Sequence, residues 1–348
     1  MASLLDTLTW LIDVPSPYGS EERLCDELEA YFEGHPVTRV GNGLVVGERT
    51  GKPLLLLVGH IDTVPHQGQP PAYVEGDRLH GLGASDMKSG VAVMIHLLED
   101  PDVESGPYDV IGVFYDREEG PIEENQLRTI LTAVPWLTDA EFAVVLEPTN
   151  LDLEEGCNGA MNITLHFEGK SAHSARPWLG ENAILKATAL LDKFAAYEPR
   201  PVEINGLTFY EVMGPTLASG GVARNIIPKD FELNVSYRFT PDRTIEEAEE
   251  HFRSFVGDLA DEIVFVDRAP SGPVPEHDPH LERLEVISQA RRQPKQGWTD
   301  VARLAEFGVP GINYGPGETA LAHQVEESVP IGHLDTAFSV LKRWLTER

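Results

Sequence analysis

Three strongly apolar segments, each followed by side chains of the kind that bind metals, constrain the fold of this chain more than any other feature. They cover residues 54–58, 110–115 and 142–146 and consist almost entirely of aliphatic and aromatic residues. Such runs are typical of parallel strands that are covered on both faces of a sheet. Because parallel strands bring their carboxyl ends to one edge of an open α/β sheet, we expect the polar residues that follow them to lie close together.

The polar residues that follow these strands are imidazoles and carboxylates: His60, Asp62, Glu118, Glu119 and Glu147. Two further candidates lie elsewhere in the sequence, Asp86 in the glycine-rich loop 81–90 and His323 near the end of the chain. Nitrogen and oxygen ligands of this kind suit zinc, manganese or cobalt. Their gathering at one sheet edge favours a metal-assisted hydrolase.

Local spacing suggests different roles for neighbouring ligands. His60 and Asp62 are two apart on an extended segment and share a face, so one can bind a metal while the other orients it. Adjacent Glu118 and Glu119 would point to opposite sides of a strand end, which would separate a metal ligand from a general base. Taken alone, Asp86 could simply cap the helix expected at 88–98. The shared position after apolar strands favours the metal site.

The pattern of elements predicts two domains. Residues 1–157 alternate helix and strand, which indicates a doubly wound α/β catalytic domain. Residues 158–272 indicate an inserted, smaller α+β domain, and residues 273–348 would complete the catalytic domain, with the Pro- and Gly-rich stretch 268–275 as the return linker. Strands are also expected at 162–167, 222–227 and 232–239. Helices are expected at 4–12, 21–32 (with Ser20 as its N-cap), 88–98, 183–194, 245–259, 280–290, 299–307 and 335–346.

Composition excludes several classes of partner. The 348 residues carry a formal charge of -30, which disfavours nucleic acid and anionic membrane surfaces. Two cysteines, Cys25 and Cys157, fit neither a disulfide framework nor a Cys-rich zinc site, and the start of the chain lacks a basic leader. We therefore expect a cytoplasmic protein with no membrane segment.

Two other chemistries are disfavoured by the loop 81–90. It lacks the Gly-Lys-Ser/Thr ending of a phosphate-binding loop, and Ser85 is followed by Asp86 and Met87 rather than by the Gly-x-Ser-x-Gly elbow of serine hydrolases. A catalytically silent binding protein would require a damaged ligand set. The remaining histidines without a neighbouring ligand pattern are interpreted as surface or packing residues; these include His66, His80, His96 and His166.

The motifs together resemble a known family, the dinuclear zinc peptidases and deacylases of the M20 type. The matching segments, in the order that family uses, are GHIDTVP (59–65), GLGASDMKSG (81–90), EE (118–119), EP (147–148) and AHQVEE (322–327). The resemblance implies two zinc ions per subunit, with cobalt or manganese as alternatives. One ion would be held by His60, Glu147 and a bridging Asp86, and the other by Glu119, His323 and the same Asp86. Glu118 would be the general base, and Asp62 would support His60.

Within that family the chain looks most like the succinyl-diaminopimelate desuccinylases. The segments that carry this likeness include YDREEGPIEENQL (115–127), GKSAHSARPWLGENAI (169–184), GGVARNIIP (220–228), YRFTPDR (237–243), GWTDVARL (297–304) and NYGPG (313–317). The likeness implies hydrolysis of N-succinyl-LL-2,6-diaminopimelate, a small N-acyl amino acid. Another amidase of the same architecture, such as an acetylornithine deacetylase or a dipeptidase, remains the alternative.

The same likeness implies roles in the inserted domain, which would be a ferredoxin-like dimerisation or lid domain of a homodimer. His173 would donate to the developing oxyanion, often from the partner subunit, and Asn225, Arg238 and Thr299 would lie near the substrate carboxylates. Arg176 is a further candidate, because a guanidinium reads a carboxylate in a bidentate manner.

Overall fold

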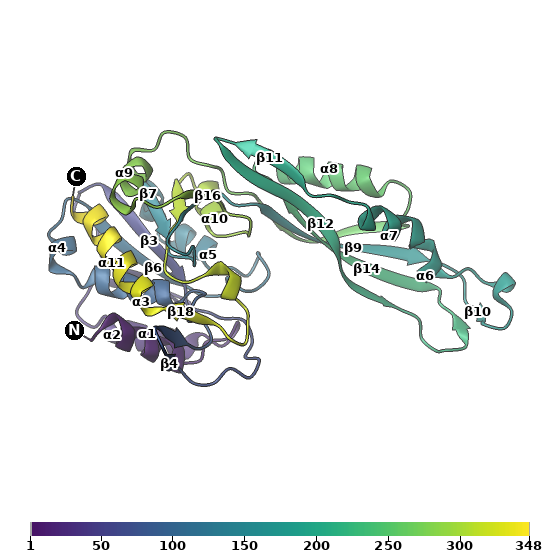
Figure 1. Cartoon of the computed structure of the whole chain (residues 1–348), viewed down its shortest axis with the longest axis horizontal. Coiled ribbons are helices and arrows are strands. Elements are labelled where there is room, and N and C mark those ends of the chain that lie inside the picture. Colours follow the sequence, from purple (N-terminus) through teal and green to yellow (C-terminus); the bar gives the residue numbers. More distant parts are fainter. Residues whose placement is uncertain (1, 348) are drawn as a thin grey trace. The chain divides into compact units, whose positions relative to one another are not determined.

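An eight-stranded mixed sheet organises the part of the chain that carries the predicted ligands. In the computed structural model (Figure 1), which describes residues 2–347, the strand order is β1-β2-β6-β3-β7-β17-β8-β16. The strands are β1 (Val37–Val40), β2 (Gly43–Val46), β3 (Leu54–His60), β6 (Asp109–Tyr115), β7 (Phe142–Val145), β8 (Leu153–Glu155), β16 (Arg292–Pro294) and β17 (Gly311–Asn313). As predicted, β3 pairs in parallel with both β6 and β7.

The centre of this sheet is covered on both faces. All 7 residues of β3 are buried, which agrees with the continuous apolar run in the sequence. The helices α1 and α11 pack against α3, and α3 packs against β3 and β6. The helices of this part of the chain are α1 (Leu4–Asp13), α2 (Glu22–Tyr31), α3 (Lys88–Leu98), α4 (Pro101–Glu104), α5 (Leu127–Ala133), α9 (Pro279–Ser288), α10 (Val301–Glu306) and α11 (Ile331–Thr346). Short 3₁₀ turns occur at η1 (Pro135–Asp139) and η3 (Thr319–Leu321).

Helix α3 has the bounds that the sequence predicted, but one predicted cap is wrong. Helix α2 has Glu21 as its N-cap residue, with no side-chain cap bond, instead of Ser20. The backbone N–H of Ser20 donates to the carbonyl of Pro17, so Ser20 belongs to the preceding turn. A side-chain cap is instead found at Ser3, which forms a capping box with Asp6 at the start of α1.

A second, small sheet has three strands, and one of them directly precedes the glycine-rich loop. It consists of β4 (Tyr73–Glu75), β5 (Arg78–His80) and β18 (Ser328–Pro330), in the order β18-β5-β4. The loop with Asp86 follows β5, and the segment with His323 precedes β18. Antiparallel pairing of β18 with β5 therefore brings the bases of these two ligand-bearing segments together.

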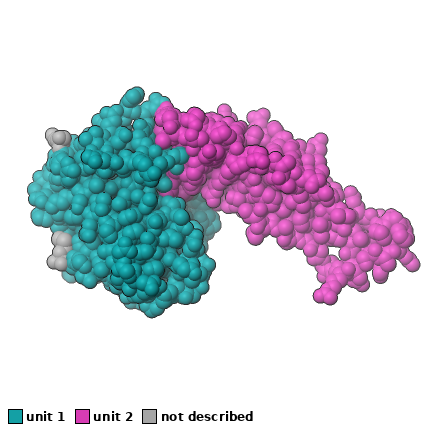
Figure 2. Space-filling model, viewed as in Figure 1, with its two compact units in different colours: residues 1–156, 275–294, 303–348 teal, residues 157–274, 295–302 magenta. Residues whose placement is uncertain are grey.

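The chain divides into two compact units (Figure 2). Unit 1 contains the elements above, except for the first two residues of α10, and runs up to Gly156, from Pro275 to Pro294, and onward from Arg303. Unit 2 comprises Cys157–Val274 and Lys295–Ala302. The stretch Lys295–Ala302 differs from the sequence-based division, which assigned all of 273–348 to the catalytic domain.

Unit 2 is an α+β body built on a five-stranded antiparallel sheet with the order β11-β12-β14-β9-β15. Within this sheet the long strands β9, β12, β14 and β15, with α6 and α7 after the first and α8 after the third, succeed one another as β-α-β-β-α-β, the order of ferredoxin-like units; β11 and the short pair β10 and β13 are additions to it. Its elements are β9 (Gly159–Glu168), β10 (Ala172–His173), η2 (Pro177–Leu179), α6 (Ala183–Lys186), α7 (Thr188–Ala195), β11 (Arg200–Ile204), β12 (Leu207–Gly220), β13 (Ile226–Ile227), β14 (Asp230–Phe239), α8 (Ile245–Val256) and β15 (Glu262–Ala269).

Several local expectations for unit 2 need correction. The strand predicted at 222–227 is reduced to Ile226–Ile227, which pairs with Ala172–His173 of β10. Strands β11, β12 and β15 were not predicted, and the end of β15 occupies the start of the stretch interpreted as a linker. Between residues 2 and 347, no helix is long and apolar enough to cross a membrane.

Candidate metal centre

Two groups of side chains near the carboxyl edge of the large sheet could each hold a metal ion. The first is His60, Asp86 and Glu147, and the second is Asp86, Glu119 and His323; in each group the potential ligand atoms lie within 4.8 Å of one another. In the first, His60 Nε2 lies 3.1 Å from Asp86 Oδ1 and 3.8 Å from Glu147 Oε1. In the second, His323 Nε2 lies 3.0 Å from Glu119 Oε1 and 3.5 Å from Asp86 Oδ2. The two oxygens of Asp86 thus face different groups.

Strand register explains why residues so far apart in sequence meet. His60 is the last residue of β3 and lies opposite Tyr115, the last residue of β6. Val58 lies opposite Val145, the last residue of β7, and Glu147 follows two residues later. The three strands therefore end almost level, and their ends deliver His60, Glu119 and Glu147 to one place.

Glu118 and Glu119 do not lie on a strand. They belong to a turn that follows β6, so the expected alternation of a strand end does not separate their side chains. Their backbone N–H groups instead donate to Asp62, from Glu118 to Oδ1 at 3.1 Å and from Glu119 to Oδ2 at 3.0 Å. Asp62 therefore fixes the turn that presents both glutamates.

Asp62 also orients His60. The side chain of Asp62 is 0% exposed, and its Oδ1 lies 3.4 Å from His60 Nδ1. The same nitrogen lies 3.0 Å from the Asp62 carbonyl oxygen, which can accept only from a protonated Nδ1. Nε2, the nitrogen facing Asp86 and Glu147, is then the one available as a ligand, which is a common arrangement of metal-binding histidines.

The carboxylates of the two ligand groups favour positive charge on the neighbouring imidazoles. Burial disfavours the imidazolium of His60, but hydrogen bonds to Asp62 and Asp86 raise its pKa well above the usual value. Hydrogen bonds to Asp86 and Glu119 raise the pKa of His323 to about 10. Burial opposes ionisation of Asp86, yet the bonds from the two imidazoles hold its pKa below the usual range. The carboxylates thus stabilise a positive charge on the two imidazoles. A divalent cation can replace that charge, because metal binding releases the protons of its histidine ligands.

One buried carboxylate next to this centre, Glu327, was not predicted from the sequence to have a role. Glu327 is 2% exposed and accepts backbone N–H groups from Gly83, Ser85 and Asp86. Burial raises its pKa to about 7, against the lowering effect of those three hydrogen bonds. No sequence signal separates it from its exposed neighbour Glu326, because only the fold buries one and not the other.

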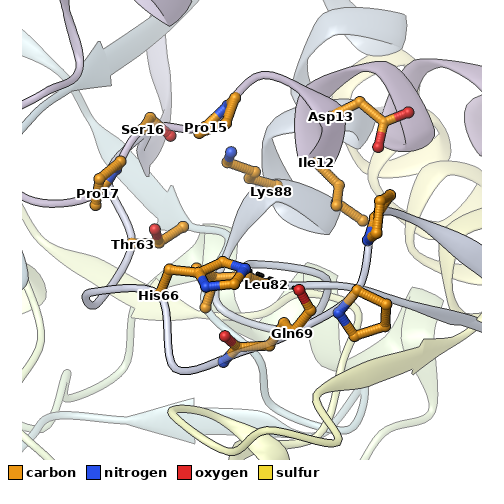
Figure 3. Close-up of a pocket in the computed structure, with 12 residues that line it drawn as sticks. Ile12, Asp13, Pro15, Ser16, Pro17, Thr63, His66, Gln69, Leu82 and Lys88 are labelled. Carbon is orange, nitrogen blue, oxygen red and sulfur yellow. Dashed lines mark hydrogen bonds between the residues drawn. The ribbon is translucent and has the colours of Figure 1, made fainter.

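A pocket of about 250 Å³ adjoins the glycine-rich loop (Figure 3). Pro15, Ser16 and Lys88 lie along one side of it, and His66 and Gln69 along the other. The Lys88 amino group donates to two carbonyl oxygens at the end of α1, and burial lowers its pKa to about 7. The pocket lining contains none of the proposed ligands.

The predicted substrate-binding residues fall into two places within unit 2. His173 and Asn225 lie at the β10–β13 pair, where Ser174 N donates to Asn225 O at 2.9 Å, and Arg176 N donates to His173 O. Arg238 lies near the other end of β14, opposite Ala160 of β9. At about 3.3 Å per residue, the length of β14 keeps these two places roughly 25 Å apart.

Thr299 also lies in unit 2, and its backbone oxygen accepts a hydrogen bond from the Cys157 thiol. Thr299 is 2% exposed, so it is buried within unit 2. Unit 2 of one chain thus does not bring all five predicted residues together.

Comparisons with known proteins agree on one family. The sequence profile of the peptidase family M20/M25/M40 matches residues 56–347. A relative from Mycobacterium tuberculosis, whose name provisionally assigns it as a succinyl-diaminopimelate desuccinylase, is 39% identical over 343 residues, covering 96% of each chain. The succinyl-diaminopimelate desuccinylase of Corynebacterium glutamicum is 34% identical over 350 residues, covering 97% of this chain and 94% of that one.

Solved structures show the same fold. A tripeptidase from Staphylococcus aureus superposes with a TM-score of 0.80 at 21% identity, covering 98% of this chain and 96% of that one. An M20 family metallo-carboxypeptidase from Sulfolobus solfataricus gives a TM-score of 0.78 at 15% identity and covers 99% of both chains. At such identities, the likeness concerns architecture alone.

Proposed function

The chain belongs to the peptidase family M20/M25/M40, and from that premise we propose that it is a metal-dependent hydrolase of N-succinyl-LL-2,6-diaminopimelate. The products are succinate and LL-2,6-diaminopimelate. The observation that carries the proposal is the pair of ligand groups that share Asp86, found in a chain whose relatives at 39% and 34% identity bear the desuccinylase name.

The donor set fits two divalent ions. His60, Asp86 and Glu147 would hold one, and Asp86, Glu119 and His323 the other, with zinc as the first choice and cobalt or manganese as alternatives. Every donor is an imidazole nitrogen or a carboxylate oxygen, and the two oxygens of Asp86 already face separate groups. When bound, such a pair of ions polarises an amide carbonyl and makes water acidic enough to react near neutral pH.

Glu118 is the proposed general base. The hydrogen bond from its backbone N–H to Asp62 holds it beside His60, and its charge contributes to the raised pKa of that imidazole. From this position the carboxylate can accept a proton from the attacking water and then give it to the leaving amine. The nitrogen of the cleaved amide leaves as the amine of diaminopimelate.

Unit 2 is the proposed source of substrate recognition. The substrate has three carboxylates, and Arg176, Asn225, Arg238 and Thr299 offer guanidinium, amide and hydroxyl donors to them. His173 Nδ1 accepts from Ala175 N at 3.0 Å, so its Nε2 carries the proton and can donate to a developing oxyanion. Since one chain keeps these donors in two places, we propose that a second copy supplies part of the set.

The edge of the unit 2 sheet supports a homodimer. Strand β11 pairs with β12 only as far as Glu211, so the remainder of β12 has β14 on one side and an open edge on the other. Leu217 on that edge is 72% exposed, and elsewhere in unit 2 Trp178 and Leu185 are 75% and 67% exposed. An open edge that carries an exposed apolar side chain is suited to pairing with a second copy of the chain. Unit 2 is accordingly proposed to be a dimerisation and lid domain.

A cytoplasmic location remains a prediction. Both Cys25 and Cys157 are free and buried, as in proteins of reducing compartments.

The proposed function is tested by comparing Glu118→Gln with the unsubstituted protein. The substitution preserves size and backbone but removes the proton acceptor, so we expect turnover of N-succinyl-LL-diaminopimelate to fall by about 10²-fold or more. Metal content should stay unchanged, because Glu118 belongs to neither ligand group. Normal turnover of the metal-loaded variant would eliminate Glu118 as the base.

A further inference from the structure

Glu327 ties the loop that carries Asp86 to the segment that carries His323. Its Oε1 accepts from Ser85 N and Asp86 N, both at 2.9 Å, and its Oε2 accepts from Gly83 N at 3.0 Å. Its backbone oxygen accepts a fourth bond, from Gly81 N at 3.1 Å. One residue therefore satisfies four N–H groups of a single loop.

The two segments are joined at two other points. At the base, Ser328 of β18 lies opposite His80 of β5, directly beside Glu327 and the start of the loop. At the far end, Glu318 N donates to Ser85 Oγ at 2.7 Å, and Ser85 Oγ lies 3.2 Å from Glu318 O. His323 lies in sequence between these fixed points. Both proposed metal-binding segments are thus held against each other along their length.

The chemistry at this position requires a carboxylate rather than an amide. Three N–H donors converge on the two side-chain oxygens, and both oxygens of a carboxyl group can accept. Glutamine offers one oxygen and one NH₂ group, so at least one backbone N–H would face another donor in a buried place. Burying a charged side chain just before strand β18 costs free energy, so the need to fill space there does not explain a glutamate.

We propose that Glu327 is a positioning residue that sets the orientation of Asp86 between the two ions. Its bond to the Asp86 backbone acts on the residue whose two oxygens face His60 and His323. Loosening that bond would disturb both ligand groups at once, because Asp86 is the member they share. This inference rests on the proposed dinuclear function.

The test compares Glu327→Gln with Glu326→Gln, the same change at the exposed neighbouring position. Zinc affinity and stoichiometry are measured by competition with a chromophoric chelator, and Co²⁺ absorption reports the geometry around the ions. We expect Glu327→Gln to bind both ions about 10- to 100-fold more weakly, the usual effect of losing a residue that orients a ligand, with an altered Co²⁺ spectrum. Glu326→Gln should match the unsubstituted protein.

Glu327→Asp is the second variant, because it keeps the charge but is one methylene shorter. It should recover part of the lost affinity, and it decides the question alone if Glu327→Gln does not fold. A folded Glu327→Gln or Glu327→Asp with a lower melting temperature but unchanged affinity and spectrum would reduce Glu327 to a purely structural role and overturn the inference. If the unsubstituted protein itself bound no ions, the proposed function would fail instead.

Discussion

The substitution Asp62→Asn tests how the fold prepares its metal ligands. The Asp62 carboxylate is 0% exposed and accepts N–H groups from both Glu118 and Glu119, one at each oxygen. Asparagine has one acceptor oxygen, so one of these two N–H groups would face an NH₂ group without water to replace the lost bond. A buried donor left unsatisfied costs about 1–3 kcal/mol.

Two separate results should therefore follow from Asp62→Asn. The free energy of unfolding of the metal-free protein should fall by about 1–3 kcal/mol. The affinity for the ion held by His60 should fall about 10- to 100-fold, because the carboxylate beside His60 Nδ1 loses its charge, although the backbone carbonyl that accepts from Nδ1 remains. Urea unfolding measures the first and competitive zinc titration the second.

Asp258→Asn is the matched control, because Asp258 is exposed in unit 2 and belongs to neither ligand group. It should change the free energy of unfolding by less than about 0.5 kcal/mol. If Asp62→Asn unfolded at the same urea concentration as the unsubstituted protein and bound zinc equally tightly, the reasoning about the turn and about His60 would both be refuted.

Three further predictions follow from packing, burial and the open edge. A Cβ at Gly315 would lie 2.5–2.6 Å from carbonyl oxygens just beyond β7, so Gly315→Ala should lower the stability of the protein by about 1–3 kcal/mol and reduce turnover. A Cβ at Gly332 would have nothing within 4 Å, so Gly332→Ala should not destabilise the protein, and thermal unfolding compares the two variants. Burial lowers the pKa of His96 in the folded protein, so as the pH falls below about 6.5 the His96 of the unfolded state is protonated first. The unsubstituted protein should therefore lose stability relative to His96→Gln as the pH falls. If the stability of the two proteins depended on pH in the same way, this prediction would be contradicted. Leu217→Lys places a charge on the open β12 edge and should shift the protein toward monomer in analytical ultracentrifugation, while equal dimer content would count against that interface.

The centre of the large sheet, strands β3, β6 and β7, was predictable because its signal is local, whereas the outer strands β1, β2, β8, β16 and β17 were not predicted. The run at 54–58 has no polar interruption, and a strand buried on both faces needs none. Once these strands were placed, general rules for parallel sheets brought His60, Glu119 and Glu147 to one edge. The structure brings them together there, with Asp86 and His323.

The missing elements lack such signals. Strand β12 contains Pro215 and ends in Gly220, its second half is exposed, and its first half buries Glu211 but exposes Tyr210, so neither an apolar run nor a simple apolar–polar alternation marks it in the sequence. Its existence depends on pairing with β14, which is a tertiary contact. The turn at Glu118 depends in the same way on Asp62, which is 56 positions away in sequence.

Glu327 illustrates the same limit within the site. Its role arises from four N–H groups of a loop more than 240 positions earlier in the chain, and the letters Glu-Glu at 326–327 cannot tell which carboxylate turns inward. Sequence reasoning found the side chains that could bind metal, but the residue that holds their loop became visible only in the fold.

The most direct test of the proposed function is to measure zinc content and succinate release on the same preparation. N-succinyl-LL-diaminopimelate is supplied beside N-acetylornithine and a simple dipeptide, before and after chelation. We predict two ions per chain, from the two ligand groups, and fast succinate release that stops on chelation and returns with zinc. Succinate release that survives complete removal of the metal, or cleavage of only the other two substrates, would contradict the proposed function.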